Sequence, residues 1–233
     1  MNIYLVRHGE SLQNKYTEFC TIPDELIPLT EKGKKQAHDV GVFLASELNN
    51  LNNSTIVCST YVRAKQTARL LNDSLGLDVS YDKRLREFKR GVFGKYSFEE
   101  CAVRFPKEFE EFKQALAGKN KFYAKAPQGE SAEDVANRIK PFKAYMDELE
   151  QKGIENLVIV SHSGAIRSFL CAVMGYDKDW YAVEKNMVNC SVRHLEKSGE
   201  NYVDNGYIYG GYKHKSRAEL SRQQNQDGPE QNL

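Results

Sequence analysis

The sequence predicts an α/β protein, a three-layer α/β/α sandwich with a mostly parallel central sheet and an inserted helical cap. Three short apolar runs, residues 3–6, 55–58 and 157–160, are continuous rather than alternating, as in strands that are buried on both faces. Each run is followed by a polar turn and then by a helical pattern, which is typical of a parallel sheet covered by helices. Residues 88–130 interrupt this alternation and predict the cap.

Helix signals follow the predicted strands in order. We expect helices over residues 30–48, 61–75, 131–150 and 165–174. Thr30 can cap the first of them, and Ser131 with Asp134 resembles a capping box at the start of the third. Gly76 and Gly175 are suited to end the second and the fourth, because glycine readily adopts the left-handed conformation that closes a helix.

The stretch 88–130 is rich in aromatic and charged residues and contains only helix-like pieces. We interpret it as a helical cap over one edge of the sheet. Further on, residues 190–195 alternate in polarity and predict an edge strand, with residues 202–209 as its candidate partner. We therefore expect one domain over residues 1–212, including the cap, and a polar, mobile C-terminal tail over residues 213–233.

The composition is that of an ordinary globular protein with a net charge of +1, which does not favour binding to nucleic acid or to a membrane surface. No apolar run approaches the roughly 18 residues that a membrane-spanning helix needs. The five cysteines are scattered and form no C-x-x-C pair, which favours reduced thiols over disulfides or a zinc site. We therefore expect a cytoplasmic protein whose partner is a small molecule.

Histidines and arginines follow the three predicted strands. Arg7 and His8 come directly after the first strand, Arg63 follows the second, and His162 follows the third. The carboxyl ends of parallel strands lie at one edge of a sheet, where ligands of open α/β folds bind, so these four side chains can converge on one site. The sequence therefore predicts an anion-binding pocket at this edge.

Such a set of side chains suits a phosphoryl group. The planar fork of arginine binds phosphate oxygens bidentately, and a neutral imidazole can attack phosphorus to form a covalent intermediate. A second histidine, when protonated, can stabilise the negative charge of the transition state. Gly9 and Gly164 are expected to let backbone amides approach the phosphate. Each residue alone has an ordinary structural explanation, so the prediction depends on their joint placement.

Six separated motifs surround these residues. In chain order they are L-V-R-H-G-E-S (5–11), L-T-E-K-G-K-K-Q-A (29–37), S-T-Y-V-R-A-K-Q-T-A (59–68), L-R-E (85–87) followed by Gly91 and Gly94, P-Q-G-E-S (127–131) and V-S-H-S-G (160–164). At these positions the sequence resembles the histidine phosphatase superfamily, also called the phosphoglycerate mutase-like family. The resemblance covers about residues 2–195, and the ordered set is far more specific than a lone R-H-G.

The resemblance implies catalytic roles for His8, Glu87, His162, Arg7 and Arg63. His8 would be the nucleophile that becomes phosphorylated, and the arginines and the second histidine would complete the phosphate pocket. Glu87 would protonate the leaving alcohol as a general acid and then activate water as a base. Without the resemblance, Glu87 would be interpreted as a surface ion-pair partner, because basic residues surround it in the sequence.

Phosphate or substrate contacts are implied for Arg7, Arg63 and His162, and for Asn14 and Ser163 as well. The resemblance implies no cofactor and no metal, because the arginines and histidines would supply the positive charge. The expected partner is a small phosphorylated metabolite, without nucleic acid or membrane. The sequence leaves the oligomeric state open, with a homodimer as one option.

Within the family, the sequence favours hydrolysis over mutase chemistry. The mutases carry a tyrosine shortly after the acid, then a lysine, and paired arginines in the cap; here Arg90 and Ser97 stand at the first two positions, and residues 113–125 contain only lysines as basic residues. We therefore expect a metal-independent phosphatase that hydrolyses a small phosphomonoester through a phosphohistidine on His8. The alternatives are a 2,3-bisphosphoglycerate-dependent phosphoglycerate mutase and a non-catalytic protein that binds a phosphorylated ligand.

Overall fold

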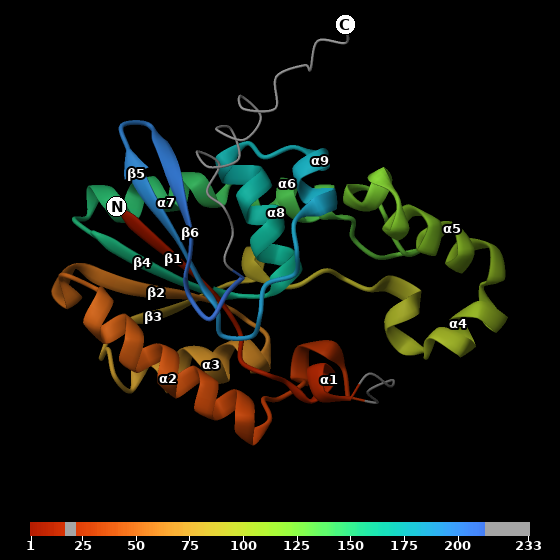
Figure 1. Cartoon of the computed structure of the whole chain (residues 1–233), viewed down its shortest axis with the longest axis horizontal. Helices are drawn as coiled ribbons and strands as arrows, with labels where there is room; N and C mark the ends of the chain where they lie inside the picture. The colour runs from red at the N-terminus through yellow and green to blue at the C-terminus, as the bar shows by residue number, and fades with distance from the viewer. Residues whose placement is uncertain (17–21, 213–233) are drawn as a thin grey trace, which may run out of the picture.

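A six-stranded β-sheet lies at the centre of the computed structural model, which describes residues 1–16 and 22–212 (Figure 1). The strands are β1 (Asn2–Arg7), β2 (Ser54–Ser59), β3 (Val79–Asp82), β4 (Asn156–Ser161), β5 (Val192–Ser198) and β6 (Asn201–Tyr209), in the spatial order β3-β2-β4-β1-β5-β6. The strands β1 to β4 run parallel, β5 pairs with β1 in the antiparallel sense, and β6 pairs with β5 in the antiparallel sense. The predicted mostly parallel sheet is therefore confirmed.

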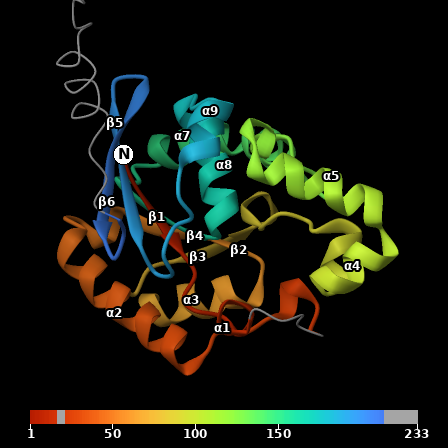
Figure 2. The same ribbon diagram turned by 45° about the vertical axis from the view of Figure 1, so that its right-hand side comes forward.

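Helices cover both faces of the sheet and complete the three-layer sandwich (Figures 1 and 2). They are α1 (Leu12–Lys15), α2 (Glu31–Glu47), α3 (Val62–Asn72), α4 (Phe98–Arg104), α5 (Pro106–Ala117), α6 (Ala132–Ile139), α7 (Phe142–Gln151), α8 (Ser163–Met174) and α9 (Lys178–Val183). Helices α2 and α3 pack on one face, and α6, α7 and α8 pack on the other. No helix in the described part of the chain is long and apolar enough to cross a membrane.

Alternate residues of each central strand supply two separate cores. On β1, Ile3 and Leu5 face the layer of α6, α7 and α8, whereas Tyr4 and Val6 face α2 and α3. All four side chains are buried. Because both faces of the strand are covered, its sequence is continuously apolar instead of alternating.

Most of the predicted helix ends lie where the capping residues place them. The Thr30 side chain accepts a hydrogen bond from the first turn of α2, and Ser131 with Asp134 forms the predicted capping box of α6. Gly175 closes α8 with a φ of 70°. The predicted helix over residues 131–150 is wrong in one respect: it is two helices, α6 and α7, because Pro141 has no amide hydrogen with which to continue α6.

Two expectations about the sheet need correction. The strand β3 pairs with β2 at one edge, although its half-buried residues carry no long apolar run that would predict a strand. The strand expected over residues 190–195 begins at Val192 as β5 and lies inside the sheet, between β1 and β6. Its expected pairing with residues 202–209 is correct, and it is β6 that forms the edge.

Residues 88–130, all of which the structure describes, contain helices and 3₁₀ turns but no strand. Helices α4 and α5 lie to one side of the sandwich, away from the helices that cover the sheet (Figures 1 and 2). The two ends of the stretch meet, because the amide of Val92 donates to the carbonyl of Pro127 at 3.0 Å. The boundaries of the cap and of a single domain over residues 1–212 stay predictions, and the predicted tail over residues 213–233 lies outside the described residues.

Candidate active site

The ends of β1, β2 and β4 bring four of the predicted site residues together. Arg7 is the last residue of β1 and His8 follows it, His162 follows β4, and Arg63 lies in the first turn of α3, after β2. Because β4 is paired with β1, the two histidines are neighbours, with ring centres 5.1 Å apart and ring planes at 61°. The structure thus places at one sheet edge the residues that the sequence assigned to it.

The hydrogen bond of His8 determines which of its ring nitrogens can act as a nucleophile. Nδ1 lies 2.8 Å from the carbonyl oxygen of Gly9. A carbonyl can only accept, so Nδ1 carries the proton and Nε2 keeps its lone pair. Burial lowers the pKa of His8 well below the ordinary value of 6.5, and the charges of Arg63 and Arg7 lower it further. At neutral pH, His8 is therefore a neutral imidazole with a nucleophilic Nε2.

The second histidine, His162, is completely buried beside the first. Its Nε2 lies 2.8 Å from Oγ of Ser59, and the Tyr61 ring packs against it edge-on with centroids 5.1 Å apart. Burial lowers the pKa of His162 well below 6.5, and neighbouring positive charges, that of Arg63 first, lower it further. Within the described residues its Nδ1 is buried and has no hydrogen-bond partner.

The two arginines are held mainly by backbone carbonyl groups. Arg7 donates from Nη1 to the carbonyl of Met187. Arg63 donates from Nη1 to the carbonyl of Asp24 at 2.6 Å and lies 3.2 Å from that residue's carboxylate. Burial lowers the pKa of Arg7, an effect that the charge of Glu87 opposes and that of Arg63 reinforces. The buried Arg63 and the partly buried Arg7, beside two neutral imidazoles, form a site that favours a multiply charged anion.

The Glu87 carboxylate lies at the N-terminus of α8, the helix that begins directly after His162. Its Oε1 accepts hydrogen bonds from the amides of Ala165 (3.0 Å) and Phe88 (3.1 Å), and its Oε2 accepts one from the amide of Gly164 (3.1 Å). Amides at a helix N-terminus lack partners within the helix and favour a carboxylate there. Glu87 is therefore fixed by the backbone next to the histidines, instead of pairing with a surface cation.

The amides of Gly9 and Gly164 both donate within the protein, and the expected approach of backbone amides to a phosphate stays a prediction. Gly9 donates to Oγ1 of Thr67 at 3.0 Å, and Gly164 donates to Glu87. Both glycines allow neighbouring groups to pack closely against the backbone. A Cβ at Gly9 would lie 2.4 Å from the carbonyl oxygen of Gly33, and one at Gly164 would lie 2.6 Å from Oε1 of Glu87.

The two additional residues of the predicted site, Asn14 and Ser163, make hydrogen bonds within the protein. Oδ1 of Asn14 accepts from the amide of Ser11 and from Nδ2 of Asn189, each at 3.1 Å. Oγ of Ser163 accepts from the amide of Met187 at 3.0 Å. Both side chains thus connect the loop before β5 to the ends of β1 and β4, and their contacts with a phosphate stay predictions.

Arg138 is the main residue of this region that sequence reasoning missed. From α6 it donates to the carbonyls of Arg86 (2.7 Å) and Glu87 (3.1 Å), and its Nε donates to Glu130 at 2.9 Å. Glu130 in turn accepts from the amide of Lys89 at 3.0 Å. Arg138 therefore holds the backbone on both sides of the Glu87 side chain. The only hint in the sequence was Glu130, which belongs to the P-Q-G-E-S motif. The sequence does not show that Arg138 is the residue that pairs with it.

Three smaller contributors were missed as well. Ser59 and Tyr61 both contact His162. They belong to the third motif, so the sequence had marked their positions as part of a family motif without giving them a role. Asn189 donates from Nδ2 to the carbonyl of His8 at 2.9 Å, and only the fold brings it there. Among the described residues, no group of three or more His, Cys, Asp or Glu side chains is placed to hold a metal ion.

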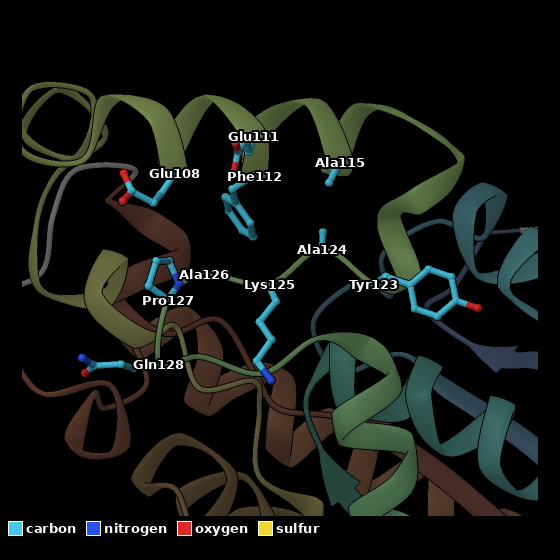
Figure 3. A pocket seen from close by; sticks show the side chains of 10 residues that line it. All are labelled: Glu108, Glu111, Phe112, Ala115, Tyr123, Ala124, Lys125, Ala126, Pro127 and Gln128. Carbon is cyan, nitrogen blue, oxygen red and sulfur yellow. The ribbon is translucent and has the colours of Figure 1, made fainter.

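Described residues of the cap contribute to the lining of two pockets. One, of about 480 Å³, has Tyr61 and Phe88 in its lining and therefore adjoins the histidines and Glu87. The other, of about 420 Å³, lies inside the cap between α5 and residues 123–128, and Phe112 points from α5 toward that segment (Figure 3). None of the described residues that line this second pocket is a histidine or an arginine. Of these two pockets, the first therefore lies next to the candidate active site.

Comparison with known proteins adds a family and several relatives. The family described as histidine phosphatase superfamily (branch 1) matches residues 3–204. A protein of Salmonella paratyphi C named "Probable phosphoglycerate mutase GpmB" is 27% identical over 208 residues, which are 89% of this chain and 90% of the relative.

Solved structures with the same fold include two phosphatases. A mycobacterial glucosyl-3-phosphoglycerate phosphatase superimposes with a TM-score of 0.73 at 24% identity, over 90% of this chain and 99% of that chain. The α-ribazole phosphatase of Shigella flexneri superimposes with a TM-score of 0.73 at 20% identity, over 93% of this chain and 100% of that chain. These two likenesses confirm the predicted fold class.

Proposed function

The chain belongs to the histidine phosphatase superfamily (branch 1) and is an enzyme of that family, and from this premise we propose that it hydrolyses a small phosphomonoester through a phosphohistidine on His8. The observation that carries the proposal is the state of His8. It is buried and neutral, its Nδ1 donates to the Gly9 carbonyl, and its Nε2 keeps the lone pair that must attack phosphorus. Arg7 and Arg63 beside it supply the charge that binds a phosphate dianion.

In the first step, Nε2 of His8 attacks phosphorus, and the bond between phosphorus and the alcohol oxygen breaks as the nitrogen–phosphorus bond forms. Glu87, protonated for this step, gives its proton to the departing oxygen. Its Oε2 accepts a single amide hydrogen bond, whereas Oε1 accepts two, so Oε2 is the oxygen that has room for the proton. His162, whose ring neighbours that of His8, stabilises the charge on the transferred group.

In the second step, Glu87 is a carboxylate that the amides of Phe88, Gly164 and Ala165 hold in place. It takes a proton from water, and the water oxygen attacks phosphorus. The nitrogen–phosphorus bond breaks, its electron pair returns to Nε2 of His8, and inorganic phosphate leaves. The net reaction consumes one phosphomonoester and one water and yields one alcohol and one phosphate.

A phosphoglycerate mutase is the second candidate, because the curated relative carries that name. The pocket supports the phosphatase better. Ser97, at the position where the mutases have a lysine, caps α4 by accepting the amide of Glu100 at 3.2 Å. Arg90 replaces the mutase tyrosine and lies in the lining of the pocket beside the site.

Two assays test the proposal. The protein should release phosphate from p-nitrophenyl phosphate, and His8→Gln should abolish the release, whereas His38→Gln, an exposed histidine of α2, should not. Turnover that persists in His8→Gln would overturn the assignment of His8 as the nucleophile.

The second assay uses 3-phosphoglycerate and 2,3-bisphosphoglycerate as substrates. We expect release of phosphate without formation of 2-phosphoglycerate. Interconversion of the phosphoglycerates would establish the mutase instead.

A further inference from the structure

Gly9 follows the nucleophile in the chain, and its carbonyl holds the proton on Nδ1 of His8. A side chain is excluded at this position, because a Cβ would lie 2.4 Å from the carbonyl oxygen of Gly33 in α2. Glycine, however, has more conformational freedom to lose on folding than any other residue. The direction of the Gly9 carbonyl must therefore be fixed by groups around it.

Gln36 of α2 holds the peptide unit that contains this carbonyl. The carbonyl of Gly9 and the amide of Glu10 belong to one planar trans unit, in which they point in opposite directions. The amide of Glu10 donates to Oε1 of Gln36 at 2.9 Å. On the other side of the same unit, the carbonyl oxygen of Gly9 lies 2.8 Å from Nδ1 of His8. Gln36 thus directs the carbonyl toward the nucleophile without contacting the His8 ring.

Thr67 of α3 holds the preceding peptide unit. Its Oγ1 accepts the amide of Gly9 at 3.0 Å and donates to the carbonyl of Arg63 at 2.7 Å. The side chain is completely buried, so water cannot easily replace its hydroxyl group. The carbonyl of the same unit, that of His8, accepts from Nδ2 of Asn189 at 2.9 Å. The peptide units on both sides of Gly9 are therefore held in place.

Gln36 and Thr67 belong to the second and the third sequence motif, yet neither takes part in the two reaction steps. Their helices, α2 and α3, pack on the same face of the sheet, and each supplies one acceptor to the backbone at Gly9. If the Gly9 carbonyl turned away, Nδ1 of His8 would lose its acceptor. The proton can then move to Nε2, the atom that must attack phosphorus, because the partner of one ring nitrogen decides where the proton lies.

We propose that Gln36 and Thr67 are positioning residues for the nucleophile: they hold the Gly9 carbonyl against Nδ1 of His8 and thereby keep Nε2 free of a proton. The inference rests on the proposed function, because the place of the proton matters for turnover only if His8 attacks the phosphate. It also gives a role to parts of two motifs that lie outside the phosphate pocket.

Nitrogen NMR of the substrate-free protein, with isotope-labelled histidine, measures which ring nitrogen of His8 carries the proton. The His8 signals are those that disappear in His8→Gln. The wild type should carry the proton on Nδ1. In Gln36→Leu and Thr67→Val, which remove an acceptor at similar side-chain volume, part of the population should carry it on Nε2. In both variants kcat/KM for p-nitrophenyl phosphate should fall about tenfold, the effect of one hydrogen bond. Gln36→Glu and Thr67→Ser keep an oxygen acceptor and should restore both properties.

The matched control is Gln66→Leu, because Gln66 of α3 is also partly buried and its Oε1 accepts a backbone amide, that of Leu29 at 2.8 Å. It should change neither the His8 tautomer nor kcat/KM appreciably. An unchanged tautomer in Gln36→Leu, or a loss that Gln36→Glu does not restore, overturns the inference, even if the buried Thr67→Val fails to fold.

The proposed function fails separately, if the wild type does not hydrolyse p-nitrophenyl phosphate or if His8→Gln remains active. The tautomer measurement needs no substrate, so it shows in either case whether Gln36 and Thr67 hold the proton on Nδ1. A wild-type enzyme that depends on His8 but keeps its full kcat/KM in both Gln36→Leu and Thr67→Val would contradict the positioning role alone.

Discussion

His8 combines the two properties that a nucleophilic histidine needs. The Gly9 carbonyl keeps the proton on Nδ1, so Nε2 retains its lone pair. Burial, together with the charges of Arg63 and Arg7, lowers its pKa. The His8 ring therefore stays neutral at pH values at which a free histidine is protonated. The arginines that would bind the phosphate thus also keep the nucleophile deprotonated before the phosphate arrives.

This coupling predicts the effect of Arg63→Gln on the titration of His8. The charge of Arg63 lowers the pKa of His8, so its removal should raise that pKa toward 6.5. Activity requires the neutral ring and is lost as the pH falls through this pKa, so the acid limb of kcat/KM should move to higher pH. NMR titration of the free enzyme measures the pKa directly. Arg69→Gln is the control, and an unchanged His8 titration in Arg63→Gln would contradict the coupling.

At the scale of elements, two helices hold the Glu87 segment from different sides. Helix α8 offers the amides of Gly164 and Ala165 to the carboxylate, and α6 offers Arg138 to the carbonyls of Arg86 and Glu87. Both helices pack on the same face of the sheet. The position of Glu87 therefore depends on how α6 and α8 are packed. Disturbing either contact should impair proton transfer by Glu87 more than nucleophilic attack by His8.

Gly164→Ala tests the contact with α8. The new Cβ would lie 2.3 Å from Cε2 of Phe88 and 2.6 Å from Oε1 of Glu87. We expect the free energy of unfolding to fall by about 1–3 kcal/mol, the usual cost of overpacking. We also expect kcat/KM for an alkyl phosphate to fall on the order of 10²-fold, because general acid catalysis is impaired. Gly118→Ala, where the nearest atom would be 3.4 Å away, should change neither quantity appreciably.

Arg138→Gln tests the contact with α6, and the leaving group separates positioning from folding. With glycerol 2-phosphate, whose alkoxide needs a proton, kcat/KM should fall at least about tenfold. With 2,4-dinitrophenyl phosphate, whose leaving group needs none, it should change little, because kcat/KM reports the step that phosphorylates His8. Arg84→Gln, which loses an ion pair with Asp82, is the control on the same segment. Equal losses with both substrates would indicate a general defect and contradict a positioning role.

The parts of the site that could be predicted from the sequence are those that the strands place directly. Arg7, His8 and His162 adjoin strand ends, so a parallel sheet alone brings them together. The contact of Arg138 with Glu87 joins residues 51 apart in the chain through the packing of α6, which no local pattern reveals. The strand β3 was not predicted for a similar reason. It is only partly buried, and it is its pairing with β2, rather than an apolar composition, that makes it a strand.

At the scale of the whole molecule, the cap lies beside a sandwich that is complete without it (Figures 1 and 2). The two core clusters consist of residues of the sheet and of the helices that cover it, and Phe88 is the only residue of the stretch 88–130 that packs against either among the described residues. The ends of the stretch meet at Val92 and Pro127. We propose on this basis that residues 88–130 are an insertion into a single domain over residues 1–212.

Replacement of residues 93–126 by a short Gly-Ser-Gly linker tests this organisation. The linker has little distance to span, because the amide of Val92 and the carbonyl of Pro127 are hydrogen-bonded at 3.0 Å. The shortened protein should unfold in a single cooperative transition and still hydrolyse p-nitrophenyl phosphate. It should be less stable than the full chain, because Phe122 no longer packs against Tyr181. A chain without cooperative unfolding, as followed by circular dichroism, would show that the cap is part of the core.

Identification of the phosphorylated residue tests the central claim most directly. The protein is mixed with p-nitrophenyl phosphate, stopped during turnover under conditions that preserve phosphohistidine, and digested for mass spectrometry. We expect the phosphoryl group on His8, and its absence from the same peptide of His8→Gln. A phosphoryl group on another residue would contradict the claim that His8 is the nucleophile. The claim would also be contradicted if the wild-type protein turned over without any phosphorylated residue and the His8→Gln variant remained active.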